Sequence, residues 1–288
     1  MYYLLLILFY PLAALPQRVL YIISDVVYFF LYRVFKYRVY VVTDNLQNAF
    51  PEKNVAEIKA ITKRFYKNFC DQWIEMLKLL SVSDKELSER FKGDWEVLEQ
   101  LRLENRNAYV LMGHSFNWEW ANVVSQLNIK QQMAGVYLPL ENKAFDRFVL
   151  KLRNRAGGMM ISMKSRKEAF ALLAQKLHVL GLIADQNPSN LNNVLWVNFM
   201  HRDAPFFVGL AYLAQKNKAA IVLSKIVKTS RGHYYMNMKR LCDDASTMQA
   251  EDIVRQYVAF LEEQIREQPE SYMWTHRRWK HTKPATEQ

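Results

Sequence analysis

The chain has little cysteine, glycine or proline. Its 288 residues include two cysteines, eight glycines and eight prolines. The two cysteines, Cys70 and Cys242, cannot form a disulfide framework, and the histidines and cysteines show no metal-ligand spacing, so no metal site is expected. We interpret both thiols as buried apolar side chains in a reducing compartment. No repeat or low-complexity tract is present, and disorder is expected only in the last few residues.

The N-terminal segment has a membrane-seeking composition. Residues 2–32 are almost wholly apolar, with breaks at Pro11 and Pro16 and with Asp25 as the only acid. Each uninterrupted piece has about 14 or 15 residues, which at about 1.5 Å per residue is too short to cross a hydrocarbon core of roughly 30 Å alone. The segment also lacks the basic start and cleavage site of a signal peptide, so we expect it to be retained. A bent span, an interfacial helix and a helix buried under the following domain all remain open.

The chain is strongly basic. It carries 39 lysines and arginines against 28 acids, a formal net charge of +11, which indicates an anionic partner. Basic residues follow the apolar segment at Arg33, Lys36 and Arg38, and recur with tryptophan in residues 277–280. Basic and aromatic residues together favour lipid headgroups over nucleic acid.

The rest of the chain alternates helical and strand patterns. Apolar runs at 109–113, 179–184 and 219–223 predict buried strands, and the residues from Trp118 onward suit a helix start. Further helices are predicted at 54–80, 167–175, 205–216 and 251–267. This order predicts an α/β fold with a mixed, mostly parallel sheet flanked by helices. With 51% hydrophobic residues and no obvious linker, the chain is interpreted as one domain, residues 43–288, behind an N-terminal anchor or interfacial helix, residues 1–42.

The segment from His114 to Glu119 carries the clearest chemistry. A histidine and a carboxylate five residues apart have the layout of a general base and its orienting acid. On a continuous helix the two side chains would lie roughly 140° apart, so they converge only if the backbone turns between them. Gly113, Ser115 and Asn117 provide such a turn between the predicted strand and helix. We therefore expect His114 at the carboxyl edge of the sheet, where open α/β folds place their active sites.

Seven blocks, in order, resemble the bacterial lipid A late acyltransferases, membrane-bound lauroyl and myristoyl transferases with an H-x4-E motif. The blocks are 44–51, His114 with Glu119, 136–139 with Asn142, Arg153 with Arg155, 184–186, 199–202 and 272–280. Leu138 departs from the basic residue often found in the family, and His201 departs from its common glycine. Both departures bear on acceptor and chain-length specificity.

The resemblance implies a glycerol-3-phosphate acyltransferase-like fold and an acyl transfer reaction. A fatty acyl chain would move from a thioester, on acyl carrier protein or coenzyme A, to a hydroxyl of a membrane lipid, with no other cofactor. His114 would act as the general base and Glu119 would hold its imidazole. No enzyme nucleophile is needed, and Ser115 lacks a G-x-S-x-G elbow.

The resemblance also implies residues that bind substrate. Arg153 and Arg155 would bind a phosphate of the acceptor's sugar or of the donor's pantetheine arm, because a planar guanidinium suits phosphate oxygens. Asp185 follows an apolar strand and is placed near the catalytic loop. The remaining positions are Tyr137, Asn142 and Arg202. For Arg202 and the Arg277–Arg278 pair, headgroup or carrier contacts and a solvated basic face stay equally open, and Trp118 and Trp120 either line an acyl slot or pack in the core.

Three functions follow from these observations. The first is an O-acyltransferase of lipid A assembly at the bacterial inner membrane, with its catalytic domain on the cytoplasmic face. The second is a same-fold acyltransferase that acts on an aminolipid or glycolipid. A non-enzymatic binder of membrane or nucleic acid is disfavoured, because the basic run lies beside Trp274 and Trp279 and the N-terminus is apolar.

Overall fold

The computed structural model describes residues 1–164, 166–188 and 190–284. The strands are β1 (Phe91–Gly93), β2 (Ala108–Met112), β3 (Gln132–Tyr137), β4 (Met159–Ser162), β5 (His178–Ile183), β6 (Val194–Phe199), β7 (Arg202–Phe207), β8 (Ala220–Ser230) and β9 (His233–Cys242). The helices are α1 (Tyr2–Ala14), α2 (Gln17–Tyr28), the π-helix η1 (Phe29–Val34), α3 (Val39–Ala49), α4 (Val55–Lys78), α5 (Asp84–Arg90), α6 (Trp95–Leu103), α7 (Trp118–Asn128), α8 (Lys143–Arg153), α9 (Arg166–Leu173), α10 (Gly209–Lys216) and α11 (Ala250–Glu267), with short 3-10 turns η2 (Ala245–Thr247) and η3 (Pro269–Ser271).

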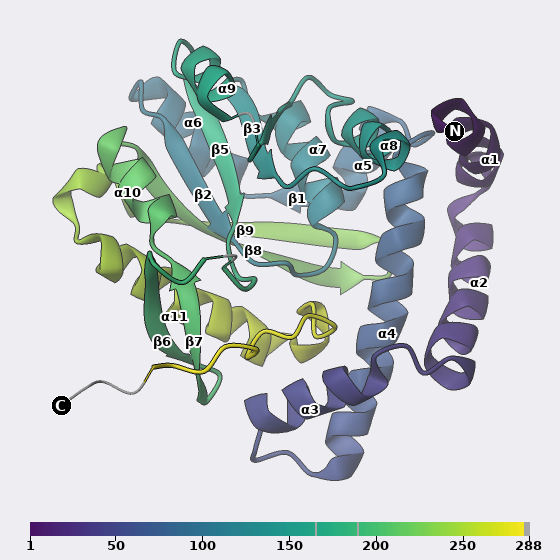
Figure 1. Cartoon of the computed structure of the whole chain (residues 1–288). Helices are drawn as coiled ribbons and strands as arrows, with labels where there is room; N and C mark the ends of the chain where they lie inside the picture. The colour runs from purple at the N-terminus through teal and green to yellow at the C-terminus, as the bar shows by residue number, and fades with distance from the viewer. Residues whose placement is uncertain (165, 189, 285–288) are drawn as a thin grey trace.

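A seven-stranded sheet forms the centre of the molecule (Figure 1). Its strand order is β1-β9-β8-β2-β5-β3-β4, and β8 pairs with β9 antiparallel while the other neighbours run parallel. All five residues of β2 are buried, as expected for a strand covered by helices on both faces. The predicted mixed, mostly parallel sheet flanked by helices is confirmed.

Two apolar cores lie on opposite faces of this sheet. Along β2, Tyr109 and Leu111 belong to the core shared with α10 and α11, whereas Val110 and Met112 belong to the core shared with α7 and α8. This alternation follows from the two-residue period of a strand. Figure 1 shows α10 and α11 on one side of the sheet and α5 to α8 on the other.

Helix α4 matches the predicted helix at 54–80 closely. It begins with a capping box, in which Asn54 accepts hydrogen bonds from two backbone N–H groups and Glu57 accepts one from the Asn54 N–H. The predicted apolar stripe holds for Ile58, Ile61 and Phe65, but Trp73 is 46% exposed. Repeated steps of four residues rotate about 40° each, so the later members turn away from the core face.

The prediction of a helix over 205–216 is wrong at its start. Residues Arg202–Phe207 form β7, which pairs antiparallel with β6 in a separate two-stranded sheet, and α10 begins at Gly209. The apolar pattern of 205–207 fits either structure, and the pairing with residues 194–196 decides it. The predicted strand at 219–223 is the buried first half of the longer β8.

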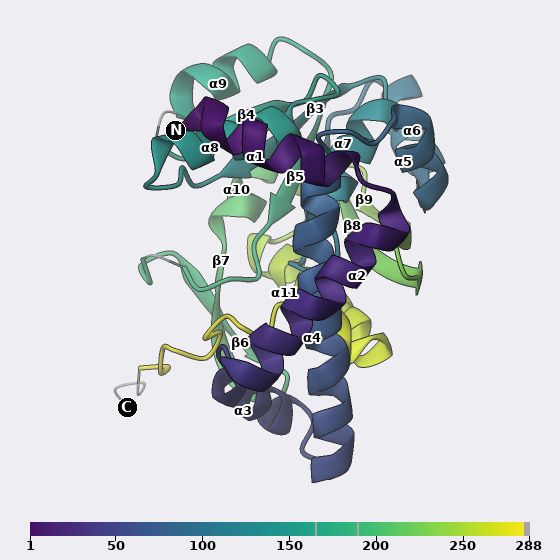
Figure 2. The same cartoon turned by 90° about the vertical axis from the view of Figure 1, so that its right-hand side faces the viewer.

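Helix α2 runs along α4 on one side of the domain, and α1 crosses the end of α4 and contacts α8 (Figure 2). No single helix in the described part of the chain is long and apolar enough for a membrane span, but Tyr2–Ala14 and Gln17–Val34 pass together as a pair bent by 114°. Lys78 stabilises the bend, because its ammonium donates to the carbonyls of Ala13 and Leu15, both at 3.0 Å. The outer faces expose large apolar side chains: Tyr3, Leu4, Ile7, Leu8, Tyr10, Ile22, Val26, Phe29, Phe30 and Phe35.

Candidate active site

His114 lies in the tight loop between β2 and α7. Gly113 precedes it, and a Cβ at Gly113 would come within 2.4 Å of Leu261 Cδ1, so any larger residue there would displace the Leu261 side chain. Phe116 adopts a left-handed conformation with φ of 47°, which is rare for an aromatic residue. The loop therefore turns sharply, as the sequence predicted, and backbone strain of this kind clusters at functional sites.

Asp185 holds the His114 imidazole. Its Oδ1 lies 2.6 Å from His114 Nδ1, and its Oδ2 accepts the His114 backbone N–H at 3.0 Å. The register explains the contact: Met112 pairs with Ile183 on the neighbouring parallel strand, and each site residue follows its strand by two positions. The carboxyl ends of β2 and β5 thus bring the two side chains together.

The protonation of this pair follows from its surroundings. Burial raises the pKa of Asp185, which is 1% exposed, but the charge and hydrogen bonds of His114 outweigh burial and bring this pKa below its ordinary value. An ionised Asp185 accepts a hydrogen bond from Nδ1–H, which keeps the proton on Nδ1, so Nε2 carries the free lone pair of the neutral ring. The His114 side chain keeps 18% exposure and meets the edge of Trp118, with ring centroids 5.1 Å apart.

Glu119 has a different partner from the one expected. Its carboxylate accepts two hydrogen bonds from Arg153, Nε to Oε2 at 2.8 Å and Nη2 to Oε1 at 2.6 Å, and a third from Trp118 Nε1 at 3.2 Å. The orienting contact predicted between Glu119 and the His114 ring is made by Asp185 instead. The reason is the helix: Glu119 stands in the first turn of α7 and points to the end of α8, where Arg153 is the last residue.

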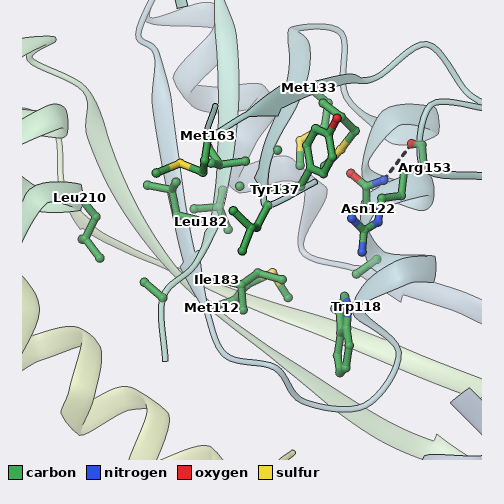
Figure 3. A pocket seen from close by; sticks show the side chains of 18 of the residues that line it. Met112, Trp118, Asn122, Met133, Tyr137, Arg153, Met163, Leu182, Ile183 and Leu210 are labelled. Carbon is green, nitrogen blue, oxygen red and sulfur yellow. Dashed lines mark hydrogen bonds between the residues drawn. The ribbon is translucent and has the colours of Figure 1, made fainter. Parts of the chain in front are cut away.

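His114, Glu119 and Arg153 line a cavity of about 890 Å³ (Figure 3). Most of the lining is apolar. Residues of both cores contribute, including Met112, Met133, Val149, Phe170, Leu182, Ile183, Leu210 and Leu213, together with the more exposed Met163. Asn122 also faces it, and donates to the Arg153 carbonyl at 2.8 Å. A cavity of this size and composition suits a long apolar ligand with one polar end.

The other predicted substrate residues divide between the cavity and the surface. Tyr137 lies in the cavity wall at the end of β3, and Leu138 is 70% exposed at its margin. Asn142 caps α8, and Arg155 donates to the Leu79 carbonyl and to Asp84. Neither belongs to the cavity lining.

Two further basic residues, Arg202 and Arg278, contact the C-terminal segment or belong to it. Arg202 lies over the Trp279 ring, 5.3 Å from its centroid, outside the cavity lining. Arg278 is 1% exposed, donates to the carbonyl of Pro205 and packs 4.2 Å from the Phe206 ring centroid. Arg278 is therefore not available for a headgroup contact and is not part of a solvated face. It anchors the C-terminal segment onto the β6–β7 hairpin. Trp118 lines the cavity, whereas Trp120 is fully buried in the core.

The arrangement provides a histidine base, an arginine and an apolar cavity. Within residues 1–164, 166–188 and 190–284, no group of three or more histidine, cysteine, aspartate or glutamate side chains could hold a metal ion. A histidine that lines an apolar cavity and is held by an aspartate can remove a proton from a hydroxyl or thiol.

The family model of the bacterial lipid A biosynthesis acyltransferases matches residues 1–281. The chain belongs to this family. A search of the curated proteins found no match. The family model covers every block that carried the resemblance, and it shows that the protein is an acyltransferase of lipid A biosynthesis.

Sequence reasoning missed some polar residues of this acyltransferase. Glu75 is fully buried behind the His114 loop and accepts a hydrogen bond from Asn117, and Asn122 donates to the Arg153 carbonyl at the end of α8. Asp185 was placed near the loop, but its bond to His114 was not predicted. His114 and Asp185 each lie two residues after the end of an apolar strand, and this equal distance could have indicated the bond.

Proposed function

We propose that the protein transfers a fatty acyl chain from an acyl thioester, on acyl carrier protein or coenzyme A, to a hydroxyl of a lipid A precursor. The observation that carries the proposal is that His114, paired with Asp185, lines an apolar cavity of about 890 Å³ in a chain of this family. The reaction needs a base for the hydroxyl and room for the acyl chain, and these residues provide both.

The chemical step uses His114 as a general base. Nε2 takes the proton of the acceptor hydroxyl as its oxygen bonds to the thioester carbonyl carbon. The tetrahedral intermediate then collapses, the carbon–sulfur bond breaks, and the leaving thiolate takes the proton back from the imidazolium. Such base catalysis contributes about 10²–10⁴-fold. Asp185 fixes the tautomer and stabilises the imidazolium, as the acid of a catalytic triad does.

Arg153 is the proposed anion contact of the site. Two of its N–H groups are held by Glu119, which fixes the guanidinium plane with the side chain still 23% exposed. The remaining donors are free to meet a phosphate of either substrate. In this proposal Glu119 acts through Arg153 and not through His114.

Membrane association is the second part of the proposal. The outer faces of α1, α2 and η1 expose apolar side chains, and a groove of about 720 Å³ lies beside them. The groove is lined by Tyr28, Ala56 and Ala60 and by five cations, Arg33, Lys59, Lys63, Arg64 and Lys67. Clusters of four to eight basic residues next to apolar helices favour anionic lipid headgroups. We place the protein on the cytoplasmic face of the bacterial inner membrane.

The test measures acyl transfer from labelled acyl carrier protein to a tetra-acylated lipid A precursor in mixed micelles. Transfer by the native chain and its loss in His114→Ala, with His233→Ala as a control for an exposed histidine, would support the proposal. Full transfer by His114→Ala would disprove the mechanism. Transfer to an aminolipid or glycolipid but not to the precursor would show that the proposed acceptor is wrong and that the proposed chemical step still holds.

A further inference from the structure

Glu75 is a buried carboxylate that the proposed mechanism does not use. It lies in the C-terminal half of α4 with no solvent exposure and is not part of the cavity lining. Three side chains donate to it, each at 2.7 Å: Tyr21 to Oε1, and Asn117 and Tyr234 to Oε2. Burial raises the pKa of Glu75, whereas the hydroxyl groups of Tyr234 and Tyr21 oppose this shift. Donors from α2, β9 and the start of α7 thus meet at one carboxyl group.

On one side, Glu75 holds the catalytic loop. Asn117 is fully buried between His114 and Glu119, and its Oδ1 accepts the Trp120 backbone N–H at 3.0 Å as the cap of α7. Its amide N–H donates to Glu75, so both ends of the Asn117 side chain are fixed. Trp120 adds a second link, because its Nε1 donates to the Glu75 carbonyl at 2.6 Å. The left-handed turn at Phe116 therefore leads directly into a segment that α4 holds in place.

On the other side, Glu75 holds the N-terminal helix α2. Tyr21 reaches inward to the carboxyl group, while the next residue, Ile22, is 64% exposed on the outer apolar face. The tip of the β8–β9 hairpin closes over Tyr21: a Cβ at Gly232 would lie 2.0 Å from its hydroxyl oxygen, and the Arg231 guanidinium lies 4.4 Å from its ring centroid. Tyr21 has little freedom to turn elsewhere.

We propose that Glu75 is a positioning residue that couples the seating of helix α2 to the geometry of the catalytic loop. The path is a chain of direct contacts, Tyr21 to Glu75 to Asn117, and no contact in it exceeds 2.7 Å. Displacement of α2 from α4 removes one donor from Glu75 and frees the carboxylate to shift, which changes the position of Asn117 and with it His114. The coupling to catalysis rests on the proposed function, while the coupling to the loop does not.

The chain contains a matched control for this test. One turn from Tyr21, Ser24 donates to Asp71 at 2.7 Å, again from α2 to a buried carboxylate of α4. Asp71 is held by Arg231 and Lys228 and makes no bond to the catalytic loop. Tyr21→Phe and Ser24→Ala therefore each remove one hydroxyl from the same helix interface, but only the first touches the path to Asn117.

The first measurement is amide hydrogen exchange of residues 114–121 in the full chain in detergent. We expect faster exchange of this segment in Tyr21→Phe and native exchange in Ser24→Ala. Equal exchange in both variants would overturn the proposal. This readout needs no activity, so it holds even if the native chain transfers no acyl group and the proposed function fails.

The second measurement separates kcat from KM in the acyl transfer assay. Misplacement of a catalytic group affects turnover, so we expect Tyr21→Phe to lower kcat about tenfold with KM near native, and Ser24→Ala to keep both. Glu75→Gln preserves the side-chain volume, but its amide N–H groups point at side chains that also donate. We expect this variant to lower kcat further. A loss in Tyr21→Phe that appears in KM or in thermal stability alone would show a merely structural role.

Discussion

Asp185 and Glu119 are both almost fully buried carboxylates close to the cavity, yet they hold different partners. Asp185, at the end of β5, accepts two hydrogen bonds from His114, while Glu119, at the start of α7, accepts two from Arg153. Strand register brings the first pair together, and the packing of two helices brings the second. In this site the acid nearest to His114 in sequence, Glu119, is not the one that holds its imidazole.

The largest expected effect is that of Asp185→Asn. An amide at this position donates to Nδ1 and favours the wrong tautomer, and the equivalent change in a catalytic triad lowers kcat by about 10⁴. We expect a loss on the order of 10³–10⁴ in kcat for acyl transfer, with Asp203→Asn as an exposed control. A variant that keeps native turnover would remove Asp185 from the mechanism.

Glu119→Gln should have a smaller effect. Its amide cannot pair with both Arg153 donors, so the guanidinium loses its fixed plane. We expect a loss of about 10- to 100-fold in kcat/KM. Asp84→Asn, which breaks the Arg155 pair outside the cavity, is the control and should stay near native. If Glu119→Gln costs more kcat than Asp185→Asn, the two carboxylates have the opposite roles.

The smallest effect concerns stability in acid. The pKa of Asp185 is lower in the folded chain than its ordinary value of 3.8. The ionised carboxylate therefore contributes to the free energy of unfolding above pH 3.8, and this contribution is lost as the pH falls from 3.8 through the folded pKa. A single proton gives at most about 1.4 kcal/mol per pH unit. Urea unfolding in detergent should show the native chain losing stability faster than Asp185→Asn over this range. Parallel curves would show that the folded pKa of Asp185 is not lowered.

Much of the fold could be predicted because it depends on local patterns. The apolar run at 179–184 and the helical stripe from Ile58 predicted β5 and α4 within a few residues. The β6–β7 hairpin could not, because residues 205–207 fit a strand or a helix until their antiparallel partner is known. Trp73 shows a second limit, since helical spacing alone does not fix the width of the buried face.

The candidate site was predicted less completely than the fold. The loop at His114 and the place of Asp185 near it followed from strand ends. The substrate roles of Asn142 and Arg155 were implied by the family resemblance, and the structure uses these residues for a helix cap and a surface ion pair. Arginine suits phosphate and carboxylate alike, so its chemistry does not select the partner.

The sequence by itself determined the alternation of strands and helices, the turn that carries His114, the apolar N-terminus and the family. Each of these depends on neighbouring residues or on order along the chain. The tertiary structure decided that Asp185, 71 residues away, holds His114, that Glu119 holds Arg153, and that Glu75 joins α2 to the catalytic loop. These contacts join side chains far apart in sequence, and only strand register and helix packing bring their atoms within hydrogen-bonding distance.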